Sequence, residues 1–203
     1  MPSLSGLYRY PLKSGRGEIL QRSAVDGLGL QGDRRWMLVD TDSGRFITQR
    51  LLPQMSQLSA LYDARGGLTL SAPGRDDLSV ALPDPEQNLR GVIVWRDTLR
   101  VPDAGDEAAE WLSALLGKPC RLVQVPEGRT RQVDTAYARP GDRVAFADGF
   151  PLLLISQASL DDLSQRVGQP LSMLRFRPNL VVTGTEPYAE DNWQRIRIGD
   201  VEF

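Results

Sequence analysis

The 203-residue chain contains no histidine and only one cysteine, Cys120. The absence of histidine excludes the Ser-His-Asp and Cys-His nucleophile systems and the usual histidine-containing zinc and non-haem iron sites. A single cysteine excludes an internal disulfide and any four-thiolate zinc or iron–sulfur centre, and we interpret Cys120 as a small buried core residue. If the protein is an enzyme, we therefore expect a bound cofactor to supply its chemistry.

The sequence also lacks a long apolar run and a large net charge. No stretch is long enough for a transmembrane helix, and residues 1–15 lack the apolar core of a signal peptide. The formal net charge is −2, so there is no general basic field for nucleic acid, and any anion site must be a local cluster of arginine and lysine. We expect a cytoplasmic protein that binds neither membranes nor nucleic acid.

Short alternating segments dominate the first hundred residues and decide the expected fold class. Residues 4–12, 18–25 and 34–42 each alternate between apolar and polar side chains, and similar short runs continue to residue 103. Glycine, proline and aspartate separate these runs at hairpin spacing, which is typical of a β-barrel or a β-sandwich. The sequence therefore predicts a mainly β, barrel-like protein with a few helices and two subdomains.

Two helices are predicted where apolar residues recur at helical spacing. The first begins at Asp106, which we expect to cap its N-terminus, and ends at Gly117, which suits a left-handed C-terminal cap. The second is capped by Ser156 and ends at Gly168. Between them, residues 128–142 are polar and without a period, which indicates a long loop at a subdomain boundary.

Two clusters of polar residues in the N-terminal part could bind an anion. Lys13 and Ser14 precede a glycine, so one turn offers an ammonium and a hydroxyl that suit a phosphate. Arg34 offers a planar guanidinium that can bind a phosphate through two hydrogen bonds. The simpler alternatives are a solvated Lys13 beside an ordinary turn, and an Arg34 that pairs with Asp33 or stacks on Trp36.

Two further clusters lie in the second half of the chain. Asp148 and Gly149 precede an apolar run that we expect to be a buried strand, and the glycine would let backbone N–H groups approach a ligand closely. Arg175, Arg177 and Asn179 share one face if their segment is a strand, and such a face needs an anionic or acidic partner. The alternatives are a plain turn for the first cluster and salt bridges to nearby carboxylates for the second.

In this order, the clusters resemble the motifs of the MOSC superfamily, whose members include the mitochondrial amidoxime-reducing component and bacterial reductases of N-hydroxylated compounds. The resemblance covers essentially the whole chain. Each piece is weak alone, but the ordered set is very specific, and it consists of YPLKS, GDRRWMLVD, FITQR, PQM, the helix around Trp111, FADGFPLLLIS, ASLDDL, FRPNLVV, EDNW and IGDVEF.

The resemblance implies an N-terminal MOSC β-barrel domain over residues 1–125 and the first part of a MOSC domain over residues 126–203. It also implies one cleft for the molybdenum cofactor (molybdopterin), whose phosphate suits lysine, arginine and serine and whose pterin edge suits an amide. The residues carried over as cofactor-binding are Lys13, Ser14, Arg34, Asp148, Gly149, Phe150, Arg177 and Asn179.

The function implied by the resemblance is the reduction of N-hydroxylated bases or amidoximes by an oxidoreductase that receives electrons from a flavin or iron–sulfur partner. In the family, the cysteine that ligates molybdenum lies a short way beyond the IGDVEF segment, and Cys120 does not match its position. We therefore expect no catalytic or metal-ligating residue before Phe203, and we expect the 203-residue chain to be inactive and to hold molybdenum weakly.

A non-enzymatic function stays open at this point. MOSC domains also accompany pyridoxal-phosphate-dependent sulfurases, and the chain would then be a sulfur-carrier or cofactor-handling module. A nucleic-acid-binding β-barrel is disfavoured, because the charge is nearly neutral and no stripe of basic and aromatic residues is present.

Overall fold

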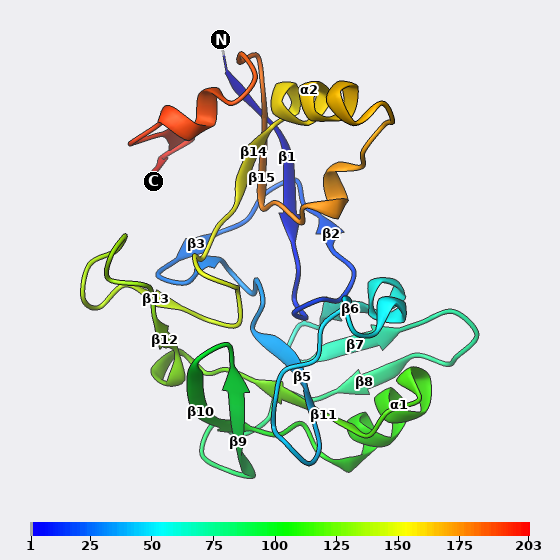
Figure 1. Ribbon diagram of the computed structural model, residues 1–203. Helices are drawn as coiled ribbons and strands as arrows, with labels where there is room; N and C mark the ends of the chain where they lie inside the picture. The colour runs from blue at the N-terminus through cyan, green and yellow to red at the C-terminus, as the bar shows by residue number, and fades with distance from the viewer. Residues whose placement is uncertain (1) are drawn as a thin grey trace. The chain divides into compact units, whose positions relative to one another are not determined.

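The computed structural model describes residues 2–203 and divides them into two compact units (Figure 1). Unit 1 contains the N-terminal residues to Arg9, residues 19–31 and residues 152–203, and unit 2 contains residues 10–18 and 32–151. The predicted mainly β architecture with two α-helices is confirmed. Within residues 2–203, however, the strands form separate small sheets and do not close into a barrel. The predicted domain division after residue 125 stays a prediction.

Unit 2 holds most of the hydrophobic core, which its alternating strands build. Strand β5 is buried along its length except at Asp40, and it pairs antiparallel with β11. The turn after β5 contains Gly44 at a φ of 66°, a left-handed conformation that glycine adopts at little cost. Its strands and short 3-10 helices are β5 (Trp36–Asp40), η1 (Pro53–Gln57), β6 (Ser59–Tyr62), β7 (Leu68–Ser71), β8 (Leu78–Val80), β9 (Leu89–Val94), β10 (Asp97–Pro102), β11 (Cys120–Gln124), η2 (Glu127–Arg129), β12 (Arg131–Gln132) and β13 (Arg143–Val144).

Helix α1 (Asp106–Leu116) lies beside β11 and β8 in unit 2 (Figure 1). Its buried face includes Leu112, and Gly117 ends it in the predicted left-handed conformation. The predicted cap was wrong, because the N-cap residue is Gly105 and no side chain caps the helix. The Asp106 carboxylate instead pairs with Arg121, at 2.7 Å.

Unit 1 is built on a sheet with the strand order β14-β15-β1-β2, in which β15 runs antiparallel to β1 and parallel to β14. Helix α2 lies beside β14 and β15 (Figure 1). Its elements are β1 (Ser3–Arg9), β2 (Glu18–Ile19), β3 (Val25–Asp26), β4 (Gly29–Leu30), β14 (Leu154–Ser156), α2 (Gln157–Val167), η3 (Met173–Arg175), β15 (Leu180–Thr183), η4 (Ala189–Asn192), β16 (Arg197–Ile198) and β17 (Val201–Glu202).

The caps of α2 confirm the sequence signals at both of its ends. The Ser156 hydroxyl accepts a hydrogen bond from the backbone N–H of Ser159, and Gly168 ends the helix at a φ of 75°. The buried strand predicted for the apolar run before α2 is shorter than expected. Only Leu154–Ser156 forms a strand, and Leu153 is exposed.

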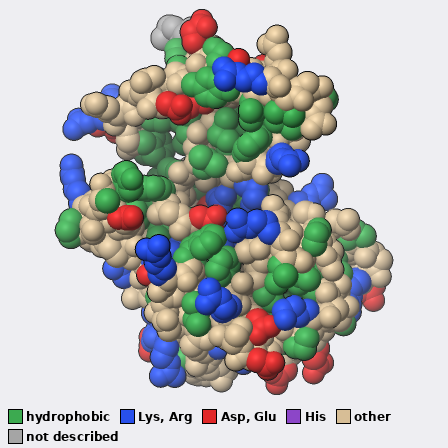
Figure 2. Space-filling model, viewed as in Figure 1, with side chains coloured by type: hydrophobic (Ala, Val, Ile, Leu, Met, Phe, Trp, Pro, Cys, Tyr) green, Lys and Arg blue, Asp and Glu red, His purple; other side chains and the backbone are tan. Residues whose placement is uncertain are grey.

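Acidic and basic side chains are interspersed on the face of the molecule shown in Figure 2, in keeping with the small net charge. No helix within residues 2–203 is long and apolar enough to cross a membrane.

Candidate functional site

Backbone hydrogen bonds in unit 2 join three segments that lie far apart in the sequence. The N–H of Arg34 donates to the carbonyl of Tyr10 (2.7 Å), and the N–H of Lys13 donates to the carbonyl of Trp36 (2.8 Å). On its other side, the carbonyl of Arg34 accepts from the N–H of Phe146 (3.1 Å). The start of β5 thus brings the Lys13 turn and the segment before Asp148 together.

Lys13 is buried, so the alternative of a solvated surface lysine is wrong. Its side chain is 5% exposed, and its ammonium donates to the carbonyl of Phe146 (2.7 Å) and to the carboxylate of Asp148. Burial lowers the pKa of Lys13 to about 8, and the charges of Arg131 and Arg34 act in the same direction, while Asp148 opposes them. Burial thus destabilises the Lys13 ammonium, and a further negative charge nearby would stabilise it.

Arg34 is held at the edge of this cluster by two neighbours. Its guanidinium pairs with Asp33 and lies 4.6 Å from the centre of the Tyr10 ring. Pairing with Asp33 was the simpler alternative drawn from the sequence, and it is present. The positive charge of Arg34 nevertheless acts on both Lys13 and Asp148. The strand predicted over Arg34 begins only at Trp36, because Arg34 has a φ of 48°.

Asp148 differs from Lys13 in being open to solvent. Its side chain is 71% exposed, although the carboxylate contacts the buried ammonium. Partial burial of the carboxyl raises its pKa, but the charge of Lys13 and hydrogen bonds from Lys13 and Trp95 outweigh this effect, so the pKa is lowered overall. An exposed carboxylate on a buried cation can leave without uncovering the core, and an external anion can take its place.

Arg131, which the sequence analysis missed, fixes the segment that carries Asp148. Its guanidinium is buried, and it donates to the carbonyls of Ala145 (3.0 Å) and Ala147 and pairs with Asp97 (3.2 Å). Burial lowers the pKa of Arg131, while Asp97 and Asp148 oppose this. Arg131 lies in the polar stretch predicted as a loop, where no periodic pattern could have singled it out.

A pocket of about 590 Å³ opens beside this cluster in unit 2. Asp148, Gly149 and Arg131 contribute to its wall, together with Trp95 and Arg96 from the turn between β9 and β10. A Cβ atom added to Gly149 would meet no atom within 4 Å, so this backbone lies open. The volume is within the usual range for small-molecule sites.

The remaining predicted residues of unit 2 lie in turns around the cluster. Ser14 is half-buried and follows Lys13 at a φ of 65°, in the left-handed region. Phe150 is half exposed and makes an edge-on contact with the ring of Tyr137, 6.3 Å between centroids. Lys13, Arg34 and Asp148 therefore come together as predicted, and Gly149 lines the adjoining pocket.

Arg177 and Asn179 belong to unit 1, and the strand predicted for them was wrong. Arg175 ends the 3-10 helix η3, Arg177 has a φ of 56°, and β15 begins only at Leu180. These residues therefore do not share a strand face. Proline at position 178 and the left-handed residue before it interrupt the extended backbone.

Asn179 is buried and joins two backbone segments of unit 1. Its amide donates to the carbonyl of Tyr8 (3.2 Å) and accepts from the N–H of Leu153 (3.2 Å). These two hydrogen bonds give the Asn179 side chain a structural role. The role of Asn179 and Arg177 toward a cofactor stays a prediction.

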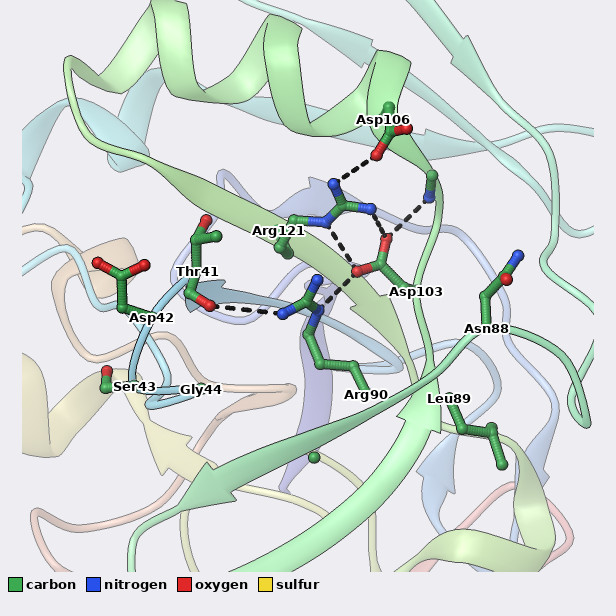
Figure 3. A pocket seen from close by; sticks show the side chains of 12 residues that line it. Thr41, Asp42, Ser43, Gly44, Asn88, Leu89, Arg90, Asp103, Asp106 and Arg121 are labelled. Carbon is green, nitrogen blue, oxygen red and sulfur yellow. Dashed lines mark hydrogen bonds and ion pairs between the residues drawn. The ribbon is translucent and has the colours of Figure 1, made fainter.

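A second pocket in unit 2, of about 600 Å³, surrounds another carboxylate with two cations (Figure 3). Asp103 is buried, and it accepts from Arg121 (2.6 and 2.8 Å), from Arg90 (2.8 Å) and from the N–H of Gly105 (2.9 Å). These hydrogen bonds, those from Arg121 foremost, lower the pKa of Asp103 although burial opposes them. No pattern in the sequence indicated this network.

Metal ligands are scarce in the described part of the chain. No group of three or more cysteine, aspartate or glutamate side chains within residues 2–203 could hold a metal ion. Cys120 is buried as predicted, and burial raises the pKa of its thiol. Such a thiol is a poor metal ligand, because the thiolate is the form that binds.

The fold and the site together define a β-rich protein with a buried cationic cluster beside a small-molecule pocket. The sequence matches the MOSC N-terminal beta barrel domain over residues 1–119 and the MOSC domain over residues 141–203. The chain therefore belongs to the MOSC family.

Three curated proteins illustrate what the chain is similar to. It is 33% identical to mitochondrial amidoxime-reducing component 1 of Xenopus laevis over 97% of this chain, and 33% identical to the Homo sapiens protein of the same name over 99%. It is 31% identical to a molybdenum cofactor sulfurase of Oryza sativa subsp. japonica over 98%. The matches span 60% and 62% of the two amidoxime-reducing components and 26% of the sulfurase.

Proposed function

We propose that this chain is the cofactor-binding part of a molybdenum-cofactor-dependent oxidoreductase that reduces N-hydroxylated bases or amidoximes. The observation that supports this proposal most is the buried Lys13 ammonium, which pairs with the exposed carboxylate of Asp148 and which the positive charges of Arg131 and Arg34 destabilise. The similarity to amidoxime-reducing components along nearly the whole chain supports the reaction class.

The donor set of the cluster fits the phosphate of the cofactor. A phosphate dianion is bound best by charge-assisted N–H and O–H donors, and Lys13, Ser14 and Arg34 carry such groups on two segments that backbone hydrogen bonds join. When bound, the molybdenum centre would supply the two-electron chemistry that removes oxygen from nitrogen.

The chain's own residues would bind and orient the cofactor. Lys13 would exchange the carboxylate of Asp148 for the phosphate and keep its proton, because a nearby anion favours the charged ammonium. Asp148 would then be available to accept a hydrogen bond from an N–H or O–H group of the ligand. Gly149 and Phe150 would shape the wall next to it, and Arg177 and Asn179 are proposed to contact the pterin.

Electrons would reach the site from a flavin or iron–sulfur partner, and the substrate would be a small N-hydroxylated compound. We propose a cytoplasmic setting, in which such compounds would be detoxified. The division into an N-terminal domain over residues 1–125 and a MOSC domain from residue 126 onward is proposed with it.

Pterin content tests the proposal most simply. The chain is produced in a host that makes the cofactor, and the bound pterin is measured by fluorescence after oxidation. Lys13→Met should lower the pterin content strongly, whereas Lys118→Met, which removes a lysine paired with Asp40 at the surface, should not. Equal pterin content in both variants would refute the site. We expect little molybdenum in any of these samples, because the only thiol, Cys120, is buried.

A second candidate function is a non-enzymatic cofactor-handling or sulfur-carrier module that works with a pyridoxal-phosphate-dependent sulfurase. The similarity to the rice molybdenum cofactor sulfurase over 98% of the chain favours it. Turnover of an N-hydroxylated substrate by the cofactor-loaded protein with a reductant would support the reductase. Transfer of sulfur to the bound cofactor, without such turnover, would support the module.

A further inference from the structure

The turn between β9 and β10 carries a tryptophan in an unfavourable backbone conformation. Val94 pairs with Asp97, so Trp95 and Arg96 form a two-residue hairpin loop. Trp95 has a φ of 56°. In such loops, asparagine, aspartate or glycine normally occupies a position with this conformation. A bulky residue with a positive φ is uncommon, and such strain gathers at functional sites.

The side chain of Trp95 is held firmly although it is 39% exposed. Its ring packs against Phe46, with 4.9 Å between centroids, and the charged groups of Lys13 and Arg50 lie 5.8 and 5.7 Å from its centre. Trp95 and Asp148 also line the same pocket. Trp95 therefore links the strained turn to the cationic cluster through its contact with Lys13.

Trp95, which is partly exposed, is one of the residues that line the 590 Å³ pocket. The pocket is also lined by Asp97 and Asp148, whose carboxylates can accept hydrogen bonds, and by Arg96, whose guanidinium can donate them. A flat aromatic wall with acceptors and donors at its edge suits a planar ligand that carries both N–H and O–H groups.

We infer that Trp95 is a substrate-positioning residue, whose indole contacts the planar group of an amidoxime or N-hydroxylated base in this pocket. The inference rests on the proposed function for the class of substrate. An amidoxime is planar and donates hydrogen bonds through its amino and hydroxyl groups, which matches the carboxylate acceptors of the pocket. The indole supplies the apolar face.

Indole N–H signals give a direct test that needs no turnover. The chain has four tryptophans, so a proton–nitrogen correlation spectrum resolves four indole signals, and Trp95→Phe assigns that of Trp95. On titration with benzamidoxime, the Trp95 signal should shift in a saturable manner. The signal of Trp111, which lies in a different pocket with Arg75, should not.

Affinity measurements on variants complete the test. Trp95→Ala should weaken benzamidoxime binding about three- to tenfold, the usual effect of one aromatic contact, while Trp95→Phe and Trp111→Phe should change it less than twofold. The remaining indole signals report whether each variant is folded. Binding that leaves the Trp95 signal unmoved, equal affinity in the alanine variant, or no binding at all would overturn the inference.

Sulfate binding, measured on the same samples, separates this inference from the proposed function. If sulfate binding depends on Lys13 while benzamidoxime binding does not involve Trp95, the positioning role fails and the anion site stands. If benzamidoxime shifts Trp95 while sulfate binding does not depend on Lys13, the positioning role stands and the proposed cofactor site fails.

Discussion

Two carboxylates of unit 2 lie among cations, and they are built in opposite ways. At Asp103 the acid is buried, with a side chain 5% exposed, and its partners Arg90 and Arg121 are more exposed, at 31% and 17%. At Asp148 the acid is 71% exposed and its partner Lys13 only 5%. The cluster at Asp103 buries its negative charge, whereas the Lys13–Asp148 pair buries its positive charge.

This difference indicates which cluster can bind a ligand. Asp103 accepts hydrogen bonds at both oxygens and cannot be withdrawn without taking from two guanidiniums the buried carboxylate that they share. Asp148 can swing into water, and the buried ammonium then needs another anion. We therefore propose that the Asp103 network stabilises the fold and that the Asp148 cluster is the one at which an external anion can bind.

The largest expected effect concerns stability. Asp103→Asn should lower the free energy of unfolding by about 3 kcal/mol, because it leaves two cations without their buried partner. Asp148→Asn, at an exposed position, should lower it by less than about 1 kcal/mol. Urea unfolding followed by tryptophan fluorescence measures both. Equal losses would show that the two clusters do not differ in the way described.

Arg34 should matter for anion binding more than an arginine of similar exposure elsewhere. Arg34→Met should weaken sulfate binding about tenfold, the typical effect of losing one charge-assisted hydrogen bond, and Arg34→Lys should restore part of it. Arg75→Met, which removes a guanidinium over the Trp111 ring, is the control and should have no effect. Titration calorimetry of the folded variants decides the matter, and a similar loss in the control would point to general charge screening.

The lowered pKa of Lys13 predicts a pH dependence of both binding and stability. Sulfate keeps its charge across the neutral range, so its affinity should fall several-fold as the pH rises through about 8 and Lys13 loses its proton. The contribution to stability has the opposite sign. Because the folded pKa lies below the unfolded value, the unfolded chain binds more protons above pH 8, and stability from this group rises toward pH 10.5. A Lys13→Met variant should show neither trend, and a binding profile that is the same with and without Lys13 would exclude this lysine as the cause.

The local fold was predictable where one residue decides the backbone. Gly117 and Gly168 end their helices in the left-handed conformation, and Ser156 caps α2. Asp106 did not cap α1, because its carboxylate is drawn to Arg121, a tertiary partner that the local sequence does not reveal. The strand expected around Arg177 failed for a different reason, because the backbone is left-handed at this residue.

The candidate site was predictable only in part. The resemblance singled out Lys13, Arg34 and Asp148, and the structure brings them together through backbone hydrogen bonds that residue spacing alone could not show. Arg131 lies in a polar stretch without a period and gave no signal. Trp95 gave none either, because the two-residue hairpin loop that makes its backbone conformation unusual is visible only in the strand pairing.

The most direct test of an exchangeable counter-ion is the sulfate affinity of Asp148→Asn, compared with Asp106→Asn, which removes an exposed carboxylate paired with Arg121. If Asp148 competes with external anions for Lys13, its neutralisation should tighten sulfate binding roughly fivefold, the effect of removing one nearby like charge. Asp106→Asn should change nothing. Unchanged or weaker sulfate binding by Asp148→Asn would contradict the account.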